Sequence, residues 1–282
     1  MLNRVYRLVW NHSRSAYMVA SEAASSSGKK SSLVRSGRQR IRRDQVVTSM
    51  ALVLATGAWA LPQGGQVVAG QATIAQTPQS MTVTQSSSKA IINWSSFGIA
   101  GTESVDFVQP GTSSVILNRV IGQDPSQIYG HLTANGQVFL VNPNGILFAK
   151  GASVDVGGLA ASTLNVSDSN FLAGKFSFTG NSQANVDNQG QIQTSDAGYV
   201  ALLGAHVSNE GRITARLGSV ALAAGQGITL DLANDGLLTL SVDQGTYQAL
   251  VANGGIIEAD GGQVLLTTQA AQSMLDTVVN DT

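Results

Sequence analysis

The sequence predicts an all-β protein built as a solenoid, in which short strands stack in successive coils of about 20 residues. The first observation is composition. Charged residues make up 12% of the chain and aromatic residues 5%, while Gly occurs 31 times, which is typical of β-chains with many tight turns. The second observation is a short motif that recurs through the last third of the chain.

The motif is Asn-x-Gly-x-Ile/Leu, followed in three of its copies by Gly-x-Val-x-Leu. Its copies begin at asparagines spaced by 21, 25 and 19 residues: Asn188, Asn209, Asn234 and Asn253. One repeat cannot bury its own apolar face, so successive coils must stack. Stacking places Val200 over Val220 at the ~4.8 Å spacing of a sheet. It likewise places Ile192 over Ile213.

The repeated asparagines then fall at one corner of the stack, where their side-chain amides can hydrogen-bond along a structural ladder. The period is close to that of leucine-rich repeats, but the Leu-x-x-Leu-x-Leu-x-x-Asn pattern is absent. The calcium-binding nonapeptide Gly-Gly-x-Gly-x-Asp is absent as well, so the sequence predicts no metal site in the coils.

Residues 135–151 (NGQVFLVNPNGILFAKG) carry the strongest local turn signals of the chain. Asn135-Gly136 and Asn144-Gly145 frame the apolar runs 138–141 and 146–148. Asn and Gly tolerate the backbone of tight turns, and Pro143 fixes φ within the second turn. The pattern predicts strand, turn and strand, and an ordinary β-hairpin remains the alternative at this point.

Charge divides the chain near residue 60. Residues 1–60 hold 10 of the 16 Lys and Arg residues and two of the 17 Asp and Glu residues. Residues 61–282 hold the remaining 6 basic and 15 acidic residues. A basic head on an acidic body indicates a targeting signal, although a small amphipathic DNA-binding arm is an alternative for the Arg cluster. The acidic body itself argues against nucleic acid as a partner.

Residues 1–60 have the layout of an extended signal peptide. A basic-aromatic extension, 1–28, leads into a basic and apolar segment, 29–60, that ends in the small-x-small site Ala58-Trp59-Ala60. We predict cleavage after Ala60. The apolar run 46–55 is about half as long as the ~20 residues that a membrane-spanning helix needs, so we assign it to the signal peptide. The mature chain should therefore be exported. Residues 3–30 resemble the extended signal peptide region of very large exported proteins of Gram-negative bacteria.

Several stretches between residues 92 and 163 point together to one family. They are INWSSF at 92–97, VDFVQP at 105–110, LNRV at 117–120, GQDPSQI at 122–128, the stretch 135–151 and VDVGGLAAST at 154–163. As an ordered set they closely resemble the N-terminal secretion domain of filamentous haemagglutinin-type exoproteins. These are the exported partners of two-partner secretion systems. The resemblance covers about residues 70–280.

This resemblance implies a right-handed parallel β-helix capped at its N-terminus by antiparallel strands. We therefore expect cap strands over residues 61–110 and the β-helix over 111–282. Trp94, the only Trp after residue 60, is expected to pack in the core or the cap. A last coil without a cap would expose a sheet edge, which predicts that the chain is the front of a longer protein or a truncated product.

The resemblance also implies partners. In the family, the periplasmic POTRA-type domains of an outer-membrane β-barrel transporter recognise the secretion domain, which then folds outside. The Sec machinery would export the precursor. We assign transporter recognition to the signature Asn142-Pro143-Asn144-Gly145-Ile146, with Asn118 and Arg119 as further contacts. A tight turn needed for folding alone remains the alternative for the signature.

The residues predict no enzyme, cofactor or metal site. The chain has no Cys, so disulfides and thiolate metal sites are excluded. Some parallel β-helices cleave acidic polysaccharides with clustered acids, but the acids here are scattered along the sequence: Asp155, Asp168, Asp187, Asp196, Glu210 and Asp231. No Ser-His-Asp arrangement or phosphate loop stands out.

We predict an adhesin of the filamentous haemagglutinin type, secreted or held at the surface of a Gram-negative bacterium after passing the periplasm. A host-cell surface or a glycan is an expected partner. Two alternatives remain. The domain could carry a contact-dependent inhibition toxin whose C-terminal part is missing, or it could be a polysaccharide-acting β-helix enzyme.

Overall fold

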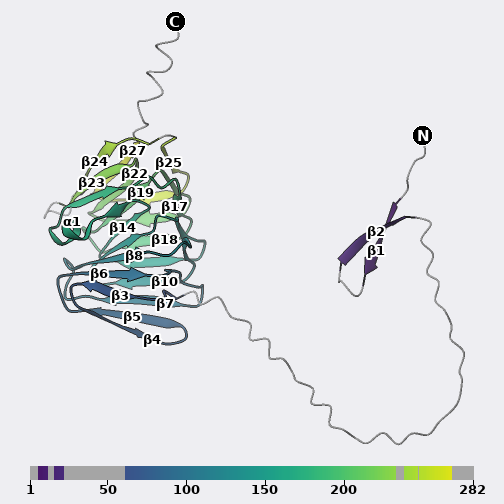
Figure 1. Cartoon of the computed structure of the whole chain (residues 1–282). Helices are drawn as coiled ribbons and strands as arrows, with labels where there is room; N and C mark the ends of the chain where they lie inside the picture. The colour runs from purple at the N-terminus through teal and green to yellow at the C-terminus, as the bar shows by residue number, and fades with distance from the viewer. Residues whose placement is uncertain (1–5, 12–15, 22–60, 233–237, 247, 269–282) are drawn as a thin grey trace, which may run out of the picture. The chain divides into compact units, whose positions relative to one another are not determined.

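The computed structural model describes residues 6–11, 16–21, 61–232, 238–246 and 248–268 (Figure 1). The chain divides into two compact units, Met1–Leu54 and Ala55–Thr282. In the first unit, β1 (Tyr6–Asn11) and β2 (Ala16–Ser21) pair antiparallel. The predicted cleavage site, Ala58 and Ala60, lies outside the described residues.

The second unit is a parallel β-helix whose coils, from β7 onward, visit three sheets in turn. Sheet 1 contains β4 (Ala72–Gln76), β5 (Ser80–Gln85), β7 (Ser104–Val108), β10 (His131–Ala134), β13 (Ser153–Val156), β18 (Gln191–Thr194), β21 (Arg212–Thr214) and β26 (Ile256–Glu258). Sheet 2 contains β3 (Gln66–Ala69), β6 (Lys89–Trp94), β8 (Val115–Val120), β11 (Gln137–Val141), β14 (Gly158–Ser162), β19 (Tyr199–Gly204), β22 (Ser219–Ala224) and β27 (Gln263–Thr268). Sheet 3 contains β9 (Ser126–Ile128), β12 (Ile146–Phe148), β17 (Asn185–Asn188), β20 (His206–Asn209) and β25 (Leu250–Asn253).

The predicted solenoid is confirmed, together with its register. Val200 pairs with Val220 in sheet 2, and Ile192 pairs with Ile213 in sheet 1, all strands running parallel. Each coil turns a period-two row of apolar residues inward, so like residues stack on like residues along the helix. That stacking is why the motif recurs at the length of one coil.

Within sheets 1, 2 and 3, antiparallel pairing of the described strands is confined to the first strands. β3 pairs antiparallel with β6, and β4 with β5. From β5 and β6 onward the strands pair parallel with β7 and β8. Within the segment expected as cap, residues 61–110, only β3 and β4 therefore reverse direction, and the strands that follow already form coils.

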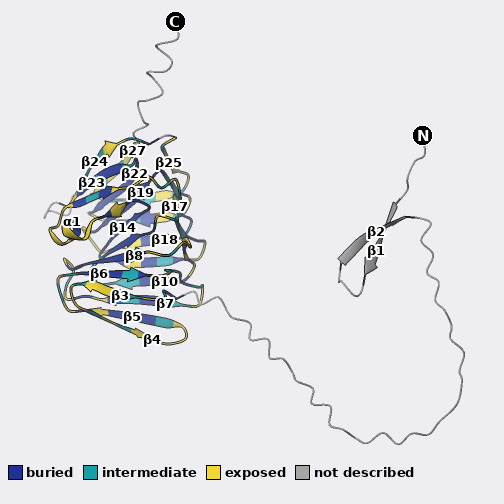
Figure 2. Ribbon diagram, in the orientation of Figure 1, coloured by how far each residue is buried: buried dark blue, intermediate teal, exposed yellow. Residues whose placement is uncertain are grey.

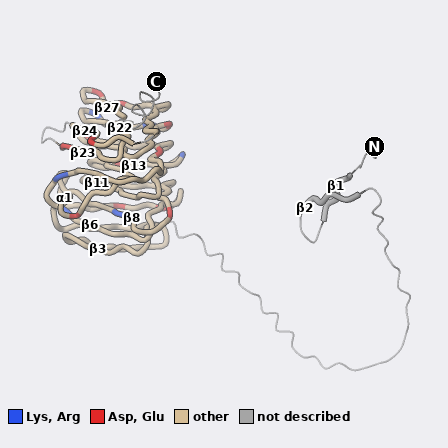
Figure 3. Tube along the Cα trace, turned by 45° about the horizontal axis from the view of Figure 1, so that its top comes forward, with Lys and Arg blue, Asp and Glu red and all other residues tan. Residues whose placement is uncertain are grey.

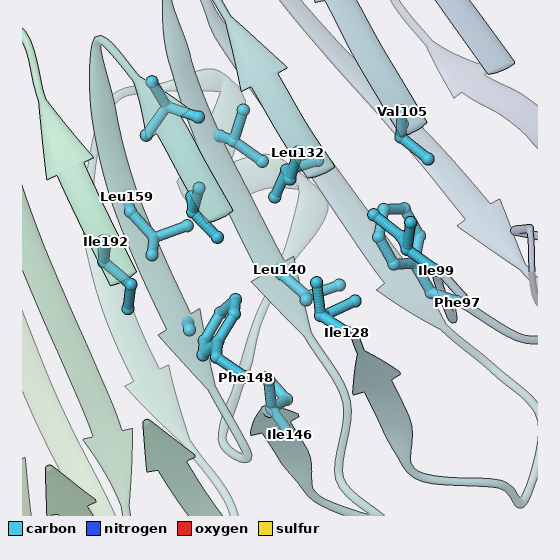
Figure 4. Packing of buried hydrophobic residues seen from close by; sticks show 14 of the residues in the cluster. Phe97, Ile99, Val105, Ile128, Leu132, Leu140, Ile146, Phe148, Leu159 and Ile192 are labelled. Atoms are coloured by element: carbon cyan, nitrogen blue, oxygen red, sulfur yellow. The ribbon is translucent and has the colours of Figure 1, made fainter. Parts of the chain in front are cut away.

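The interior of the helix is filled by one apolar core that runs through all three sheets. Side chains such as Leu132, Leu140 and Phe148 point inward from successive strands of one coil (Figure 4). Trp94 lies in this core with 1% of its surface exposed, and its ring packs edge-on against Phe97 with 5.7 Å between the ring centroids. This agrees with the expectation that Trp94 packs in the core or the cap.

A second apolar core lies outside the solenoid, against the outer face of sheet 2. It is covered by α1 (Asp168–Leu172) and an antiparallel outer sheet made of β15 (Asn165–Val166), β16 (Phe176–Thr179), β23 (Gly227–Leu232) and β24 (Leu238–Gln244). The middle strands of sheet 2 are thus buried on both faces (Figure 2), which explains unbroken buried runs such as Tyr199–Gly204.

The outer sheet was not expected from the sequence. The chain leaves the solenoid between β14 and β17 and again between β22 and β25. Residues 111–282 therefore contain two excursions in addition to coils. The repeat assigned at Asn234 lies in the second excursion: Asn234 is outside the described residues, and Leu238, which completes its motif, begins the outer-sheet strand β24.

Candidate recognition site at the Asn-Pro-Asn-Gly corner

The signature Asn142-Pro143-Asn144-Gly145 forms the corner between β11 and β12. The Gly145 N–H donates to the Asn142 carbonyl at 3.1 Å, which closes a turn, and Gly145 has a φ of +114°. β11 pairs with β8 and β14 in sheet 2, whereas β12 pairs with β9 and β17 in sheet 3. Strand, turn and strand is therefore correct, and the hairpin alternative is wrong.

The Asn142 side chain is fully buried and uses both ends of its amide. Its Nδ2 donates to the Asp124 carbonyl and to Ser126 Oγ, each at 3.0 Å. Its Oδ1 accepts from the Asn144 N–H at 2.9 Å and from Asn144 Nδ2 at 3.1 Å. The amide therefore pins this corner to the corner of the preceding coil.

The rest of the signature extends the same network. Asn144 Nδ2 donates to the Gly122 carbonyl at 2.8 Å. The Pro143 carbonyl accepts from Ser182 Oγ at 2.6 Å, which ties down the chain where it returns from the first excursion. Ile146 is buried, and Pro143 is the one exposed residue of the signature. In the folded domain the signature therefore hydrogen-bonds its own corner to the neighbouring segments of the chain.

Asn118 lies inside the solenoid and not on its surface. It is 0% exposed and stands in sheet 2 between Ile92 and Leu140. Its Oδ1 accepts from Trp94 Nε1 at 3.0 Å, and its Nδ2 donates to the Phe139 carbonyl at 3.4 Å. A side chain in this place satisfies the indole N–H of a buried Trp. It has no access to a partner of the folded domain.

Arg119 projects from the outer face of sheet 2 and holds the first excursion. Its guanidinium donates to Asn165 Oδ1 at 2.9 Å and to the Val166 carbonyl at 2.7 Å, and it pairs with Asp168 at 2.7 Å. The Arg119 side chain is only 14% exposed. Its contacts are thus internal to the domain.

The predicted asparagine ladder is present over three coils. Asn188 Nδ2 donates to Asn209 Oδ1, and Asn209 Nδ2 donates to Asn253 Oδ1, both at 2.7 Å. Asn253 pairs directly with Asn209, so no coil intervenes at Asn234. In earlier coils Phe148 takes the position below Asn188, and the ladder therefore begins only at Asn188.

Sequence reasoning missed a second polar corner, between sheets 1 and 2. Gln109 Nε2 donates to Gln85 Oε1 at 3.0 Å and to the Ser114 carbonyl at 3.1 Å. Asn135 Nδ2 donates to the Gln109 carbonyl at 2.8 Å. These amide residues follow one another at 24 and 26 residues, which is close to one coil, and that spacing was the available signal.

The acids considered for polysaccharide cleavage are not gathered by the fold (Figure 3). Asp155 lies on sheet 1, Asp187 on sheet 3 and Asp231 on the outer sheet. Among the residues that the structure describes, no group of three His, Asp or Glu side chains could hold a metal ion. In the same part of the chain, no helix is long and apolar enough to span a membrane.

In the part of the chain that the structure describes, the groups with a shifted pKa all have structural partners. Burial raises the pKa of the Tyr199 phenol, whose OH donates to Gln137 Oε1 at 2.9 Å. A hydrogen bond from Arg212 lowers the pKa of Glu258, and one to Asp196 raises the pKa of Arg216. Both ion pairs lie on exposed surface, as expected of a solvated face.

Comparison with known proteins agrees with this geometry. The family "Extended Signal Peptide of Type V secretion system" matches residues 3–58, and the family "TPS secretion domain" matches residues 58–282. The crystal structure of the HMW1 secretion domain from Haemophilus influenzae is similar, with a TM-score of 0.68 and 38% identity, over 73% of this chain and 55% of that chain.

Two curated relatives are named heme/hemopexin-binding protein, both from Haemophilus influenzae. One is 35% identical over 232 residues, covering 76% of this chain and 24% of the relative. The other is 34% identical over 243 residues, covering 77% of this chain and 26% of the relative. The chain thus spans about a quarter of the length of these relatives.

The matched family is a secretion domain of exoproteins and not an enzyme family, and it implies a cognate outer-membrane transporter as partner. The chain belongs to the TPS secretion domain family and is a secreted exoprotein of a Gram-negative bacterium, exported through the periplasm by two-partner secretion.

Proposed function

We propose that this chain is an adhesin-type exoprotein whose secretion domain is read by periplasmic POTRA-type domains of its transporter before it folds. The observation that carries the proposal is the match of the TPS secretion domain to residues 58–282, directly behind an extended signal peptide at 3–58. The Sec machinery delivers the precursor to the periplasm in this scheme.

The geometry of the signature supports recognition of the unfolded chain. In the folded corner, the amides of Asn142 and Asn144 are already hydrogen-bonded within the protein, and Asn118 is fully buried. A receptor that reads these side chains must meet them before the coils form. The same residues then build the corner once the chain has crossed the membrane.

Folding outside the cell would favour export in one direction. Each coil that forms buries apolar side chains, at about 25 cal/mol for each Å² removed from water. The asparagine and glutamine corners add hydrogen bonds that exist only in the stacked state. A chain that has begun to stack therefore resists sliding back through the pore.

The test is export from cells with and without the transporter, with Asn142→Ala as the variant and Asn209→Ala as the matched control. Both asparagines are fully buried, and both side chains make hydrogen bonds between coils. We expect transporter-dependent appearance of a chain that begins at Leu61. We also expect Asn142→Ala and Asn209→Ala to lose similar amounts of folded stability. Asn142→Ala should nevertheless reduce export about tenfold more than Asn209→Ala does.

Equal losses of export in the two variants would reduce the signature to a folding turn. Export without the transporter would overturn the two-partner assignment to this partner. The free energy of unfolding is measured on the purified chains, so that a defect in recognition is distinguished from a defect in folding.

The names of the relatives favour a second candidate, binding of heme or hemopexin by the whole exoprotein. A Soret titration with heme and a pull-down on immobilised hemopexin test it, and cell adhesion assays test the adhesin. A toxin domain with an adjacent immunity gene downstream of the codon for Thr282 would support the toxin alternative. Depolymerisation of acidic glycans would support the enzyme alternative.

A further inference from the structure

Residues Ser167–Lys175, which we call the strap, cross the outer face of sheet 2 with little buried surface of their own. The strap contains α1, a helix of 5 residues. Phe171 is its one buried residue, Asn170 is partly buried, and the other residues of the strap are exposed, as the colours around α1 show (Figure 2). A segment with a single apolar anchor can detach at far lower cost than a strand of the solenoid.

The anchor enters an aromatic cluster on sheet 2. The Phe171 ring packs edge-on against Phe139 of β11, with 5.6 Å between centroids, and lies 6.0 Å from the Phe176 ring. Phe139 also packs against Phe176 at 4.9 Å. The Phe139 and Phe176 rings therefore keep their mutual contact when Phe171 leaves, and its departure exposes the faces that Phe171 covered.

Two cations from neighbouring sheet-2 strands hold the ends of the strap. Arg119 of β8 pairs with Asp168 at the start of α1. Lys89 Nζ of β6 donates to the Leu172 carbonyl at its end, at 2.8 Å. Lys89 and Arg119 are two of the 6 basic residues after residue 60, so a third of these basic residues contact this one segment.

We propose that the strap is a lid that opens and closes locally while the solenoid stays folded, with Phe171 as its anchor and Lys89 and Arg119 as its clasps. Opening exposes the Phe139 and Phe176 rings, which Phe171 contacts in the closed state. The inference does not depend on the proposed function, because every contact that carries it lies within the folded domain.

Trypsin reports on the lid through Lys175, an exposed residue at the end of the strap whose N–H donates to the Asn170 carbonyl at 2.8 Å. We expect native wild-type chain to be cut after Lys175 at a rate that low urea does not change. Phe171→Ala should raise that rate about a hundredfold, because the closed state loses its buried ring. Arg119→Met should raise it roughly fivefold.

Arg216→Met is the matched control, since Arg216 makes a bidentate pair with exposed Asp196 away from the strap. It should leave cleavage after Lys175 unchanged. Hydrogen exchange of the wild-type amides of residues 170–175 gives a second readout, which decides the matter if Phe171→Ala does not fold. Cleavage and exchange that follow global unfolding in urea would overturn the proposal, as would an unchanged rate in folded Phe171→Ala.

Discussion

At the residue scale, the buried side-chain amides of this domain hydrogen-bond neighbouring coils to one another. Asn142 and Asn188 each use one end of the amide within their own corner and the other end toward a neighbouring coil. Asn209 bonds to the coil on either side of it, through Asn188 and Asn253. A buried amide is tolerated only when its donors and acceptors are used, so each of these residues depends on its neighbours in the stack. The polar corners thereby fix which coil lies on which.

Asn209→Ala tests this role in the ladder. The substitution leaves the amide of Asn188 without its acceptor and the Oδ1 of Asn253 without its donor, so we expect a loss of about 2 kcal/mol in the free energy of unfolding. Urea denaturation measures it, with an unchanged m-value. Exposed Asn185, whose side-chain Nδ2 donates to Asp187 Oδ2 at 3.3 Å, supplies the control Asn185→Ala. A loss equal to that of the control would show that the ladder adds no stability.

At the element scale, sequence periodicity predicted the strands of the repeating coils. It failed for the segments in which the chain leaves the coils. Val200 and Val220 stack as predicted because both lie on strands of equal length in adjoining coils. The repeat spacing included Asn234, which lies outside the described residues, whereas the ladder passes directly from Asn209 to Asn253; the excursion between them adds about one coil's length to the chain. The outer sheet was missed because its antiparallel strands alternate with the same period of two as the coils.

The residues proposed for transporter recognition show a different limit. Asn118 and Arg119 were assigned from resemblance as neighbours in one motif, yet adjacent strand residues face opposite sides of a sheet. Asn118 therefore enters the inner core, and Arg119 reaches the strap. Hydropathy could not tell which face of sheet 2 a side chain of β8 occupies, because both faces of the middle strands of that sheet are buried.

The corner between sheets 1 and 2 explains the Gly-x-Val-x-Leu part of the repeat. A Cβ at Gly218 would collide with the Gly198 carbonyl oxygen, and one at Gly262 with the Gly218 carbonyl oxygen. Successive coils thus approach backbone to backbone at this corner, which only glycine allows. The glycine of the motif is a requirement of stacking and not of a turn.

Gly218→Ala should therefore destabilise the domain by about 3 kcal/mol, because the added methyl group has backbone on its far side and cannot be accommodated by a side-chain shift. Thermal and urea denaturation of the purified chain measure the loss. Gly101→Ala is the control, since nothing lies within 4 Å of a Cβ there. Similar stability of the two variants would mean that the corner can widen without cost.

At the scale of the whole molecule, stability should vary along the solenoid. Strands β8, β11, β14 and β19 have neighbours on both edges and apolar layers on both faces. Among the described strands, β25, β26 and β27 each have a neighbour on one edge only. Apolar residues of these last strands are also partly open to solvent: Leu250 is 53% exposed and Leu266 52%.

We therefore expect amide hydrogen exchange to be slowest in β8, β11 and β14 and fastest in β25 to β27. A stack in which each coil contacts only its neighbours opens from its ends, so protection should fall stepwise and not all at once. Exchange measured by mass spectrometry at several urea concentrations checks the order. Equal protection in β11 and β27 would show that the β-helix unfolds as a single cooperative unit, with no preferred end.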